Sequence, residues 1–402
     1  MQIGFARSAI MLGLLAAIGP FTIDMYLPAM PIIASDLGTD STGVQTTLSI
    51  YFLAFGLAQL VYGPAADMYG RKPPLYAGLA LFMAGTIGCA LAPTIGWLIA
   101  FRFVQGVGGA AVMVIPRAIV RDLHTGPQAT RLMALIMLVI SVSPMLAPLA
   151  GSGLVALSGW RAVFWALVGA CVVSFLVTSF MLPETLKPEN REPFDFTHLL
   201  RGSRILFTSP IFMGLTFVGG FGLASFFVFL ATASFVYSDW YGLTPTQFSL
   251  AFAVNAIGFF ASSQLAANLG ERFGMARTVL MASCGFAFFD LTLLAVTLFA
   301  QPSLPFLMVM LVLGNSCLGL VIPSSMVMAL DDHGHIAGLA SSLGGTLQMM
   351  TGAVMIALAG PFLDGTPRPM VAAIAVCATM TLIIALLVLR ARPSAAQPGP
   401  AE

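Results

Sequence analysis

Long apolar segments recur along the whole chain, and they constrain its fold more than any other feature. A helix needs about 20 mostly apolar residues to cross a bilayer, and hydropathy identifies twelve such segments. They lie near residues 8–31, 44–66, 74–93, 97–120, 131–157, 161–182, 210–237, 246–269, 276–299, 303–329, 335–361 and 369–390. Glycine and proline are frequent within them, which membrane helices tolerate because neighbouring helices satisfy the freed backbone groups. The sequence therefore predicts an all-α membrane protein of twelve transmembrane helices.

The composition excludes other classes of protein. Of the 402 residues, 58% are hydrophobic and only 8% are charged, whereas soluble domains carry about 25% charged residues. The net charge is +1 and no basic patch occurs, so we expect no nucleic-acid partner. The five cysteines are scattered through apolar runs without a Cys-x-x-Cys pair, which argues against a metal or redox site.

One polar interruption divides the chain into two halves of six spans each. We predict an amino-terminal six-helix bundle over 1–182, a linker over 183–209, a carboxy-terminal six-helix bundle over 210–392 and a disordered tail over 393–402. The halves resemble each other where a charged turn follows a span. Asp67, Tyr69 and Gly70 follow the second span, and Glu271, Phe273 and Gly274 recur 204 residues later after the eighth. This recurrence supports two parallel six-helix repeats.

The distribution of lysine and arginine predicts the orientation. With a cytoplasmic amino terminus, thirteen of these residues lie on the cytoplasmic side, and only Arg161 and Arg368 lie outside. The thirteen are Arg7, Arg71, Lys72, Arg121, Arg131, Lys187, Arg191, Arg201, Arg204, Arg272, Arg277, Arg390 and Arg392. The positive-inside rule then places both termini in the cytoplasm. The first apolar run continues through Pro20 and Asp24 without a convincing cleavage site, so we expect an uncleaved first helix rather than a signal peptide.

An acidic residue, Asp24, lies inside the first predicted span. A carboxylate there costs roughly 2.5–3.5 kcal/mol on insertion scales, so such a residue usually faces a watery cavity or has a partner. The functional interpretation is a proton or ion site. The alternative is a carboxylate close enough to the end of the helix to reach water.

A buried cation is predicted at a similar depth. The first span runs outward and the fourth runs inward, which brings Asp24 and Arg102 into the outer half of the membrane together. We expect the two to interact, directly or through water, in at least one state, because pairing relieves the cost of both charges. Arginine stays protonated, so Asp24 is the candidate proton carrier. The alternative is that Arg102 extends its side chain to the outer surface.

Two further groups of polar residues allow two interpretations each. Asp290 in the ninth span is either a second site or, as we favour, a structural residue bonded to a neighbouring helix. All four histidines fall in predicted cytoplasmic loops. Of these, His333 and His335 lie beside Asp331 and Asp332, which favours a solvated turn over a metal site.

Three motifs resemble those of one family. The run Gly63-Pro-Ala-Ala-Asp67-Met-Tyr-Gly70-Arg71-Lys72 resembles the signature loop between helices two and three of the major facilitator superfamily. The run Arg102-Phe-Val-Gln105-Gly106-Val-Gly108-Gly109 resembles the fourth-helix motif of its proton-coupled members. The run Asp24-Met-Tyr26-Leu27-Pro28 resembles the first-helix motif of drug:proton antiporters, in the form found in the bicyclomycin-resistance (Bcr/CflA) subfamily. Gly159-Trp160-Arg161 is similar to that subfamily too.

The resemblance implies a fold and residue roles. It implies two six-helix repeats around a central cavity, with proton coupling by Asp24 and Arg102. Conformational gating is implied for Gly63, Asp67, Gly70, Arg71, Asp122, Pro148 and Gly151. Asp67 would contact the start of helix eleven, and Arg71 would pair with an acid such as Asp122. The alternative for Asp67 and Arg71 is an ordinary solvated turn.

Candidate substrate residues lie on helices that can line a midplane cavity between the halves. They are Tyr26, Tyr51, Gln105, Phe226, Phe227, Asn255, Asn315, Gln348 and Met349. The alternative for each is packing or contact with lipid. Some relatives that export cations carry a second acid two turns before the first. Here that position is near Ala16, which favours neutral or zwitterionic substrates.

The expected function is proton-coupled efflux of drugs or antibiotics by alternating access, from a monomer in a bacterial inner membrane. Protons are the coupling ion, and no cofactor is expected. The alternative is a proton-coupled carrier or exporter of a sugar or other small metabolite. Neither His-Glu-x-x-His nor Gly-x-Ser-x-Gly occurs, nor does the phosphate-binding run Gly-x-x-x-x-Gly-Lys-Ser/Thr, which argues against an enzyme and an ATP-driven pump.

Overall fold

Nearly all of the molecule is helical. The computed structural model describes residues 4–124, 126–191, 196–331 and 333–391, and no β-strand occurs among them. Twelve helical stretches in this part of the chain are long and apolar enough to cross a membrane, which confirms the predicted fold class. The predicted tail over 393–402 lies outside the described residues.

The first half of the chain forms six spans, the first of which is broken. Its helices are α1 (Phe5–Asp24), α2 (Met30–Asp36), α3 (Ser41–Tyr69), α4 (Lys72–Leu91), α5 (Ile95–Leu123), α6 (Gly126–Ser158) and α7 (Arg161–Met181). Prolines inside α3, α5 and α6 do not end these helices, as expected for membrane spans. The helix α3 starts where the Asp40 carboxylate accepts a hydrogen bond from the Gly43 amide at 2.8 Å, which satisfies one of the free donors of its first turn.

The second half forms the other six spans. They are α9 (Pro210–Phe235) with the π-helical turn η3 (Val236–Trp240), α10 (Pro245–Phe273), α11 (Met275–Phe299), α12 (Leu304–Asp331), α13 (Ala337–Ala359) and α14 (Pro367–Ala391). A capping box between Thr244 and Gln247 starts α10, so both side chains satisfy backbone groups that the helix leaves free. Between α7 and α9, the predicted polar linker contains a helix that the sequence analysis did not anticipate, α8 (Phe196–Thr208).

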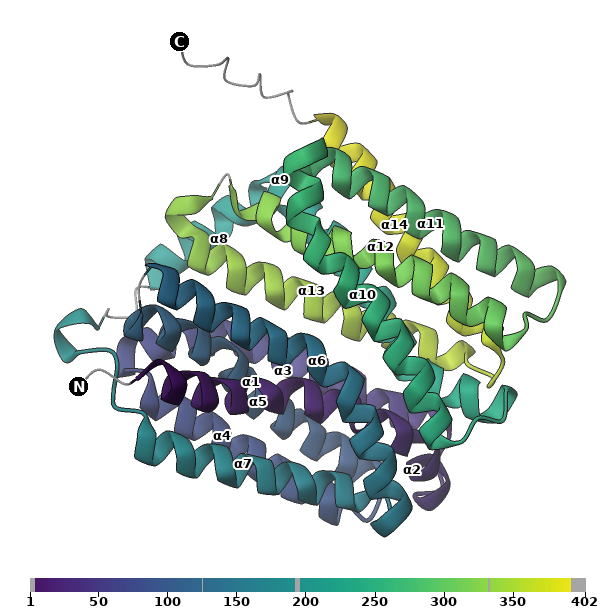
Figure 1. The fold of residues 1–402 in the computed structure, drawn as a ribbon, viewed down its shortest axis with the longest axis horizontal. Coiled ribbons are helices and arrows are strands. Elements are labelled where there is room, and N and C mark those ends of the chain that lie inside the picture. The colour runs from purple at the N-terminus through teal and green to yellow at the C-terminus, as the bar shows by residue number, and fades with distance from the viewer. Residues whose placement is uncertain (1–3, 125, 192–195, 332, 392–402) are drawn as a thin grey trace.

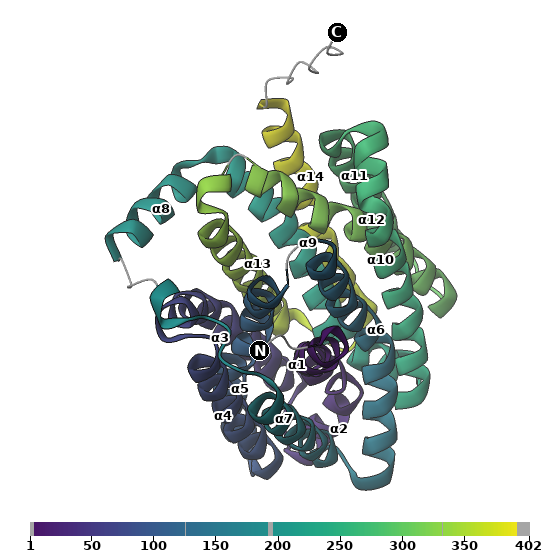
Figure 2. The ribbon, with the colours of Figure 1, turned by 60° about the vertical axis from the view of Figure 1, so that its left-hand side comes forward.

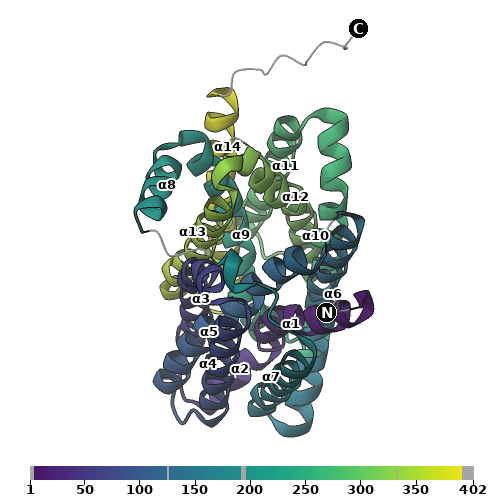
Figure 3. The ribbon, with the colours of Figure 1, turned by 90° about the vertical axis from the view of Figure 1, so that its left-hand side faces the viewer.

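The helices gather into two groups that follow the order of the chain. Helices α1–α7 lie together, and α9–α14 lie together beside them (Figures 1 and 2). Successive spans alternate in direction, and each group has six of them. The chain therefore begins α1 and ends α14 at the same end of the molecule. We call this end the terminal face and the opposite end the far face. The helix α8 lies at the rim of the terminal face (Figure 3).

The two groups meet mainly along α3 and α13. Three side-chain hydroxyls donate hydrogen bonds to main-chain carbonyls across this seam. The bonds are Thr42 to Gly360 at 3.1 Å, Ser49 to Ala353 at 2.7 Å and Thr346 to Gly56 at 2.8 Å. A second seam joins α6 to α10, where Ser249 donates to the Pro148 carbonyl at 2.9 Å. In the described part of the chain, these hydrogen bonds all lie in the half of the molecule between the far face and the middle of α3. In this state the two helix groups are therefore joined over their far half.

Candidate functional site

The first span breaks directly after Asp24. The helix α1 ends at Asp24, a 3₁₀ turn covers Leu27–Ala29, and α2 begins at Met30. Pro28 and Pro31 explain the break, because proline has no N–H to donate and its ring crowds the preceding turn. The sequence analysis predicted one span over 8–31, and one candidate span does cover Phe5–Asp36, but the turn within it was not anticipated. The two prolines were the available signal.

The Asp24 side chain is buried, with 4% of the residue exposed. Among the residues that the structure describes, none forms a hydrogen bond or ion pair with its carboxylate. Its place at the carboxyl end of α1 adds the negative end of the helix dipole. An ionised carboxylate at this position is therefore costly unless a cation or donor approaches it.

Arg102 lies next to the same break and is fully buried. Its Nη1 atom donates to the Gln105 side-chain carbonyl at 2.7 Å and to the main-chain carbonyl of Thr22 at 3.5 Å. Gln105 in turn donates to the Thr86 hydroxyl at 2.9 Å. The guanidinium is thus held by its own helix and by α4, and it reaches the last turn of α1, where a cation is favoured.

Two tyrosine rings enclose the guanidinium. The ring centroids of Tyr26 and Tyr51 both lie 4.6 Å from the Arg102 Cζ atom, so cation–π attraction replaces part of the lost hydration. The Tyr26 hydroxyl is hydrogen-bonded to Thr47 at 2.8 Å. Within the described residues, Nε and Nη2 of Arg102 and the hydroxyl of Tyr51 have no hydrogen-bond partner. The site therefore holds a buried cation with donors to spare, and the interaction of Arg102 with Asp24 remains a prediction for another state.

A glycine on α6 brings a neighbouring helix against the break. A Cβ atom added at Gly151 would lie 2.9 Å from the Cα and 3.0 Å from the carbonyl carbon of Met25. Real Cβ atoms rarely come this close, so only glycine permits the observed approach. Gly151 therefore packs directly on the residue that follows Asp24.

The nine predicted substrate residues fall into separate places. Tyr26, Tyr51 and Gln105 surround Arg102, as described above. At the seam, the Phe227 ring stacks on Phe52 with 3.8 Å between centroids, and Met349 packs against Gly56.

The other four belong to the second group of helices. Asn315 donates to Asn255 at 2.8 Å, and the Nε2 atom of buried Gln348 has no partner among the described residues. Phe226 stacks on Phe259 with 5.4 Å between centroids, so it packs within its own helix group. A common cavity for the nine residues stays a prediction.

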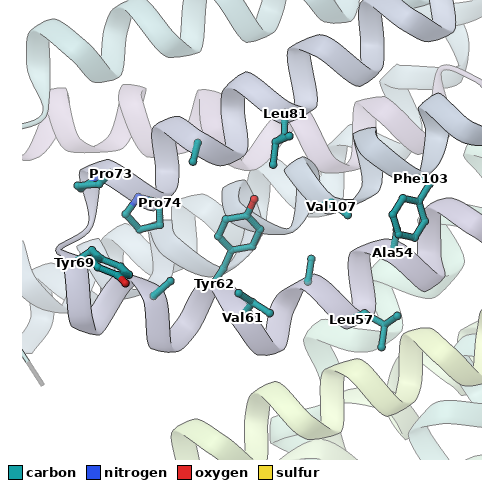
Figure 4. Close-up of a pocket in the computed structure, with 13 residues that line it drawn as sticks. Ala54, Leu57, Val61, Tyr62, Tyr69, Pro73, Pro74, Leu81, Phe103 and Val107 are labelled. Atoms are coloured by element: carbon teal, nitrogen blue, oxygen red, sulfur yellow. The ribbon is translucent and has the colours of Figure 1, made fainter. Parts of the chain in front are cut away.

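A groove lies elsewhere, on the outer surface of α3, α4 and α5 (Figure 4). It has a volume of about 610 Å³ and contains none of the predicted substrate residues. Its lining is almost wholly apolar, and Leu57, Val61 and Phe103 expose large parts of their side chains there. In a membrane protein this groove faces acyl chains rather than the interior.

A charge cluster on the terminal face matches one predicted contact. The Arg71 guanidinium binds Asp122 through Nε at 2.8 Å and Asp67 through Nη1 at 2.5 Å, so the predicted pairing of Arg71 with Asp122 is confirmed. Burial alone would lower the pKa of Arg71, but its hydrogen bonds to Asp122 and Asp67 raise it above the ordinary value. Gly70 has a φ of 93°, which an L-residue rarely adopts. The predicted contact of Asp67 with the start of helix eleven stays a prediction, and nothing in the structure explains a gating role for Gly63.

The sequence analysis missed one member of this cluster, Glu184. Its carboxylate accepts hydrogen bonds from the backbone amides of Arg71 at 2.8 Å and Lys72 at 3.1 Å. These amides belong to the start of α4, where an anion is favoured. Glu184 thereby ties the end of α7 to the loop after α3. Nothing in its local sequence marked it apart from the other linker charges.

A second cluster, on the far face, holds the end of the broken span. The Asp36 carboxylate accepts hydrogen bonds from the Trp160 indole and from Arg161, both at 2.8 Å. Arg161 also donates to the Ala92 carbonyl at 3.2 Å. Three helix ends are joined there, which fixes α2 beyond the break.

Two remaining predictions have different outcomes. Asp290 is 1% exposed, and its Oδ2 atom has no partner among the described residues, so its role stays open. The predicted solvated turn is wrong for His333, which is buried and packs edge-on against Phe212 with 5.5 Å between ring centroids. Asp332 and the side chain of His335 lie outside the described residues.

Comparison with known proteins identifies the family. The sequence model of the Major Facilitator Superfamily matches residues 12–349. The chain belongs to this superfamily. It is 33% identical over 358 residues to the uncharacterized MFS-type transporter YdgK of Bacillus subtilis, covering 88% of each chain. It is also 29% identical over 377 residues to the bicyclomycin resistance protein homolog of Haemophilus influenzae, covering 92% of this chain and 93% of the relative.

Solved structures show the same fold. A crystal structure of the nucleoside transporter NupG superposes with a TM-score of 0.74 at 12% identity, covering 96% of this chain and 99% of the other. As a member of the Major Facilitator Superfamily, the protein is a multi-pass membrane transporter of small molecules and not an enzyme.

Proposed function

We propose that the protein is a drug:proton antiporter that exports drugs or antibiotics by alternating access. The observation that carries this proposal is the buried Asp24 carboxyl at the break of the first span, beside a buried Arg102 that has unused donors. The name of the Haemophilus influenzae relative, a bicyclomycin resistance protein homolog, supports export of an antibiotic.

The two side chains supply the coupling step. An ionised Asp24 is stabilised when its carboxylate turns to the free Nε and Nη2 donors of Arg102. Once a proton binds, the neutral carboxyl no longer needs these donors, and the contact is released. The break after Asp24 lets the carboxyl move without unwinding α1. Arg102 stays charged throughout, so the proton travels on Asp24.

Alternating access couples this step to the two helix groups. We place the terminal face in the cytoplasm by the positive-inside rule and the protein in the bacterial inner membrane as a monomer. The present state, joined over its far half by the bonds of α3 to α13, is then closed to the outside. Opening outward breaks these bonds and exposes Asp24 to external protons. A charge moved across the membrane contributes about 2.3 kcal/mol per 100 mV.

The side chains of the second helix group favour neutral or zwitterionic substrates. The amides of Asn255, Asn315 and Gln348 are buried and carry no charge. The free Nε2 atom of Gln348 can donate to a carbonyl or hydroxyl of a substrate. The same amides can hydrogen-bond the hydroxyls of a sugar, which supports the second candidate function, transport of a sugar or other metabolite.

Transport in proteoliposomes with an imposed pH gradient tests the proposal. Bicyclomycin and a panel of neutral and cationic drugs are offered, with sugars as the alternative substrates. We expect a drug to move against its own gradient when protons flow the opposite way, and Asp24→Asn to abolish this. Asp239→Asn, which alters an exposed acid at the far face, is the matched control. Gradient-driven transport at the wild-type rate by Asp24→Asn would exclude Asp24 as the carrier, and sugar transport alone would select the second candidate.

A further inference from the structure

The linker helix α8 presents apolar side chains at the edge of the molecule. Leu200 is 60% exposed and Phe207 is 51% exposed. The two residues are seven positions apart, so they lie on the same side of the helix. Two large exposed apolar residues side by side on a polar linker require an explanation.

The rest of α8 is fixed to the second group of helices. Leu206 is fully buried, and Gly202 faces the Leu339 side chain at the start of α13. With about 100° of rotation per residue, the buried strip of Gly202 and Leu206 lies roughly 130° around the helix from Leu200 and Phe207, with Ser203 between the two strips. The packing of α8 against α13 therefore fixes the direction in which Leu200 and Phe207 point.

Two arginines complete the surface. Arg201 and Arg204 are both exposed, and they lie on the strip that follows the apolar pair around the helix. Neither forms an ion pair with a residue in the described part of the chain. Around the helix axis, the buried residues Gly202 and Leu206 come first. The exposed pair Leu200 and Phe207 follows, and Arg201 and Arg204 come after that pair.

The position of α8 puts this surface at the boundary of the membrane. The helix lies between α7, which ends at Met181, and α9, which begins at Pro210. Figure 3 looks onto the terminal face and shows α8 lengthwise at the rim, beside α13. A helix at this level with an apolar edge and flanking cations fits the interface between acyl chains and headgroups.

We propose that α8 binds the surface of the bilayer that the protein spans, with a preference for anionic phospholipids. Leu200 and Phe207 insert among the upper acyl chains. Arg201 and Arg204 then contact the phosphates and acidic headgroups, since cations near an anionic surface are attracted to it. Ile205, on the opposite flank, faces water as an isolated exposed apolar residue. This inference does not depend on what the protein transports.

Spin labels on single cysteines in the full-length protein test the arrangement. Labels are placed at Leu200, Phe207, Ile205 and Thr208 in a Cys284→Ser background, which removes the exposed native thiol. The protein is reconstituted in phosphatidylcholine vesicles with or without phosphatidylglycerol. Accessibility to oxygen reports acyl chains, and accessibility to a soluble nickel complex reports water.

We expect labels at Leu200 and Phe207 to favour oxygen several-fold over the labels at Ile205 and Thr208. Phosphatidylglycerol should increase this difference. The Arg201→Gln/Arg204→Gln double variant should lose the increase. The control Arg272→Gln/Arg277→Gln, which removes two exposed arginines from other helices on the same face, should keep it.

Three results would overturn the proposal. Nickel accessibility at Leu200 and Phe207 equal to that at Thr208 in all vesicles would leave α8 in water. Exclusion of both oxygen and nickel at these positions would mean that the apolar pair packs against protein. An effect of phosphatidylglycerol that survives the loss of Arg201 and Arg204 would remove the arginines from lipid binding.

Discussion

Gly151 of α6 packs against the backbone of Met25, the residue at which the first span departs from its helix. The contact leaves no room for a side chain at position 151. It links α6, which also contacts α10 through Pro148 and Ser249, to the position of Asp24. Movement between the two helix groups can therefore be transmitted to the break without a polar contact to the carboxylate.

We expect Gly151→Val to disturb the break and to reduce proton-driven transport by about tenfold or more. Overpacking typically costs about 1–3 kcal/mol, and here it acts next to the proposed proton carrier. Gly153→Val is the matched control, because no atom of the described residues lies within 4 Å of a Cβ atom at that position. The measurement is the initial rate of drug export under a pH gradient, normalised to inserted protein. Equal rates for the two variants would mean that the approach of α6 to Met25 is unimportant.

The enclosure of Arg102 predicts that lysine cannot replace it. Lysine keeps the charge but lacks the planar group that lies between the rings of Tyr26 and Tyr51. We expect Arg102→Lys to insert in the membrane and to lose most proton-coupled transport. The same substitution at exposed Arg272 should leave transport unchanged. Wild-type coupling in Arg102→Lys would show that any cation suffices.

The two tyrosines should respond differently to loss of their hydroxyls. Tyr26 is hydrogen-bonded to Thr47, so Tyr26→Phe should lower stability by about 0.5–1.5 kcal/mol. The Tyr51 hydroxyl has no partner among the described residues, so Tyr51→Phe should leave thermal stability nearly unchanged. If the hydroxyl binds Asp24 or substrate in another state, transport by Tyr51→Phe falls while stability does not. Thermal unfolding in detergent, measured beside transport, separates the two effects.

The sequence predicts the twelve spans because membrane burial depends on the summed hydropathy of long segments, which is a local property. It also anticipates the pairing of Arg71 with Asp122, although only through resemblance to a family. The break after Asp24 was missed because Pro28 and Pro31 look like prolines that continuous spans elsewhere in the chain tolerate.

Contacts between distant segments account for the other omissions. Glu184 is important because α4 begins beside it, and His333 is buried because Phe212 covers it. Neither relation leaves a local pattern in the sequence. The helix α8 did leave one, in the spacing of its apolar and basic residues, but its charges made the segment look like a simple polar linker.

The seam between α3 and α13 predicts how the conformational equilibrium can be shifted. Ser49 and Thr346 each donate a hydrogen bond to a carbonyl of the other helix group. Ser49→Ala/Thr346→Val removes both donors. Each lost hydrogen bond costs about 0.5–1.5 kcal/mol, because the two carbonyls keep their bonds within α13 and α3. The penalty applies only to the state joined at the far half, so we expect the population to move toward the state that is open there.

Distances between spin labels at Thr94 and Gln301, two exposed far-face positions on different helix groups, report this shift. In a Cys284→Ser background, the double variant should show a larger fraction of long distances than the parent. Thr351→Val is the control, because among the residues that the structure describes its hydroxyl bonds only to Leu347 within α13. An unchanged distance distribution in Ser49→Ala/Thr346→Val would mean that packing, such as the stack of Phe52 on Phe227, holds the far half closed without help from the hydroxyls.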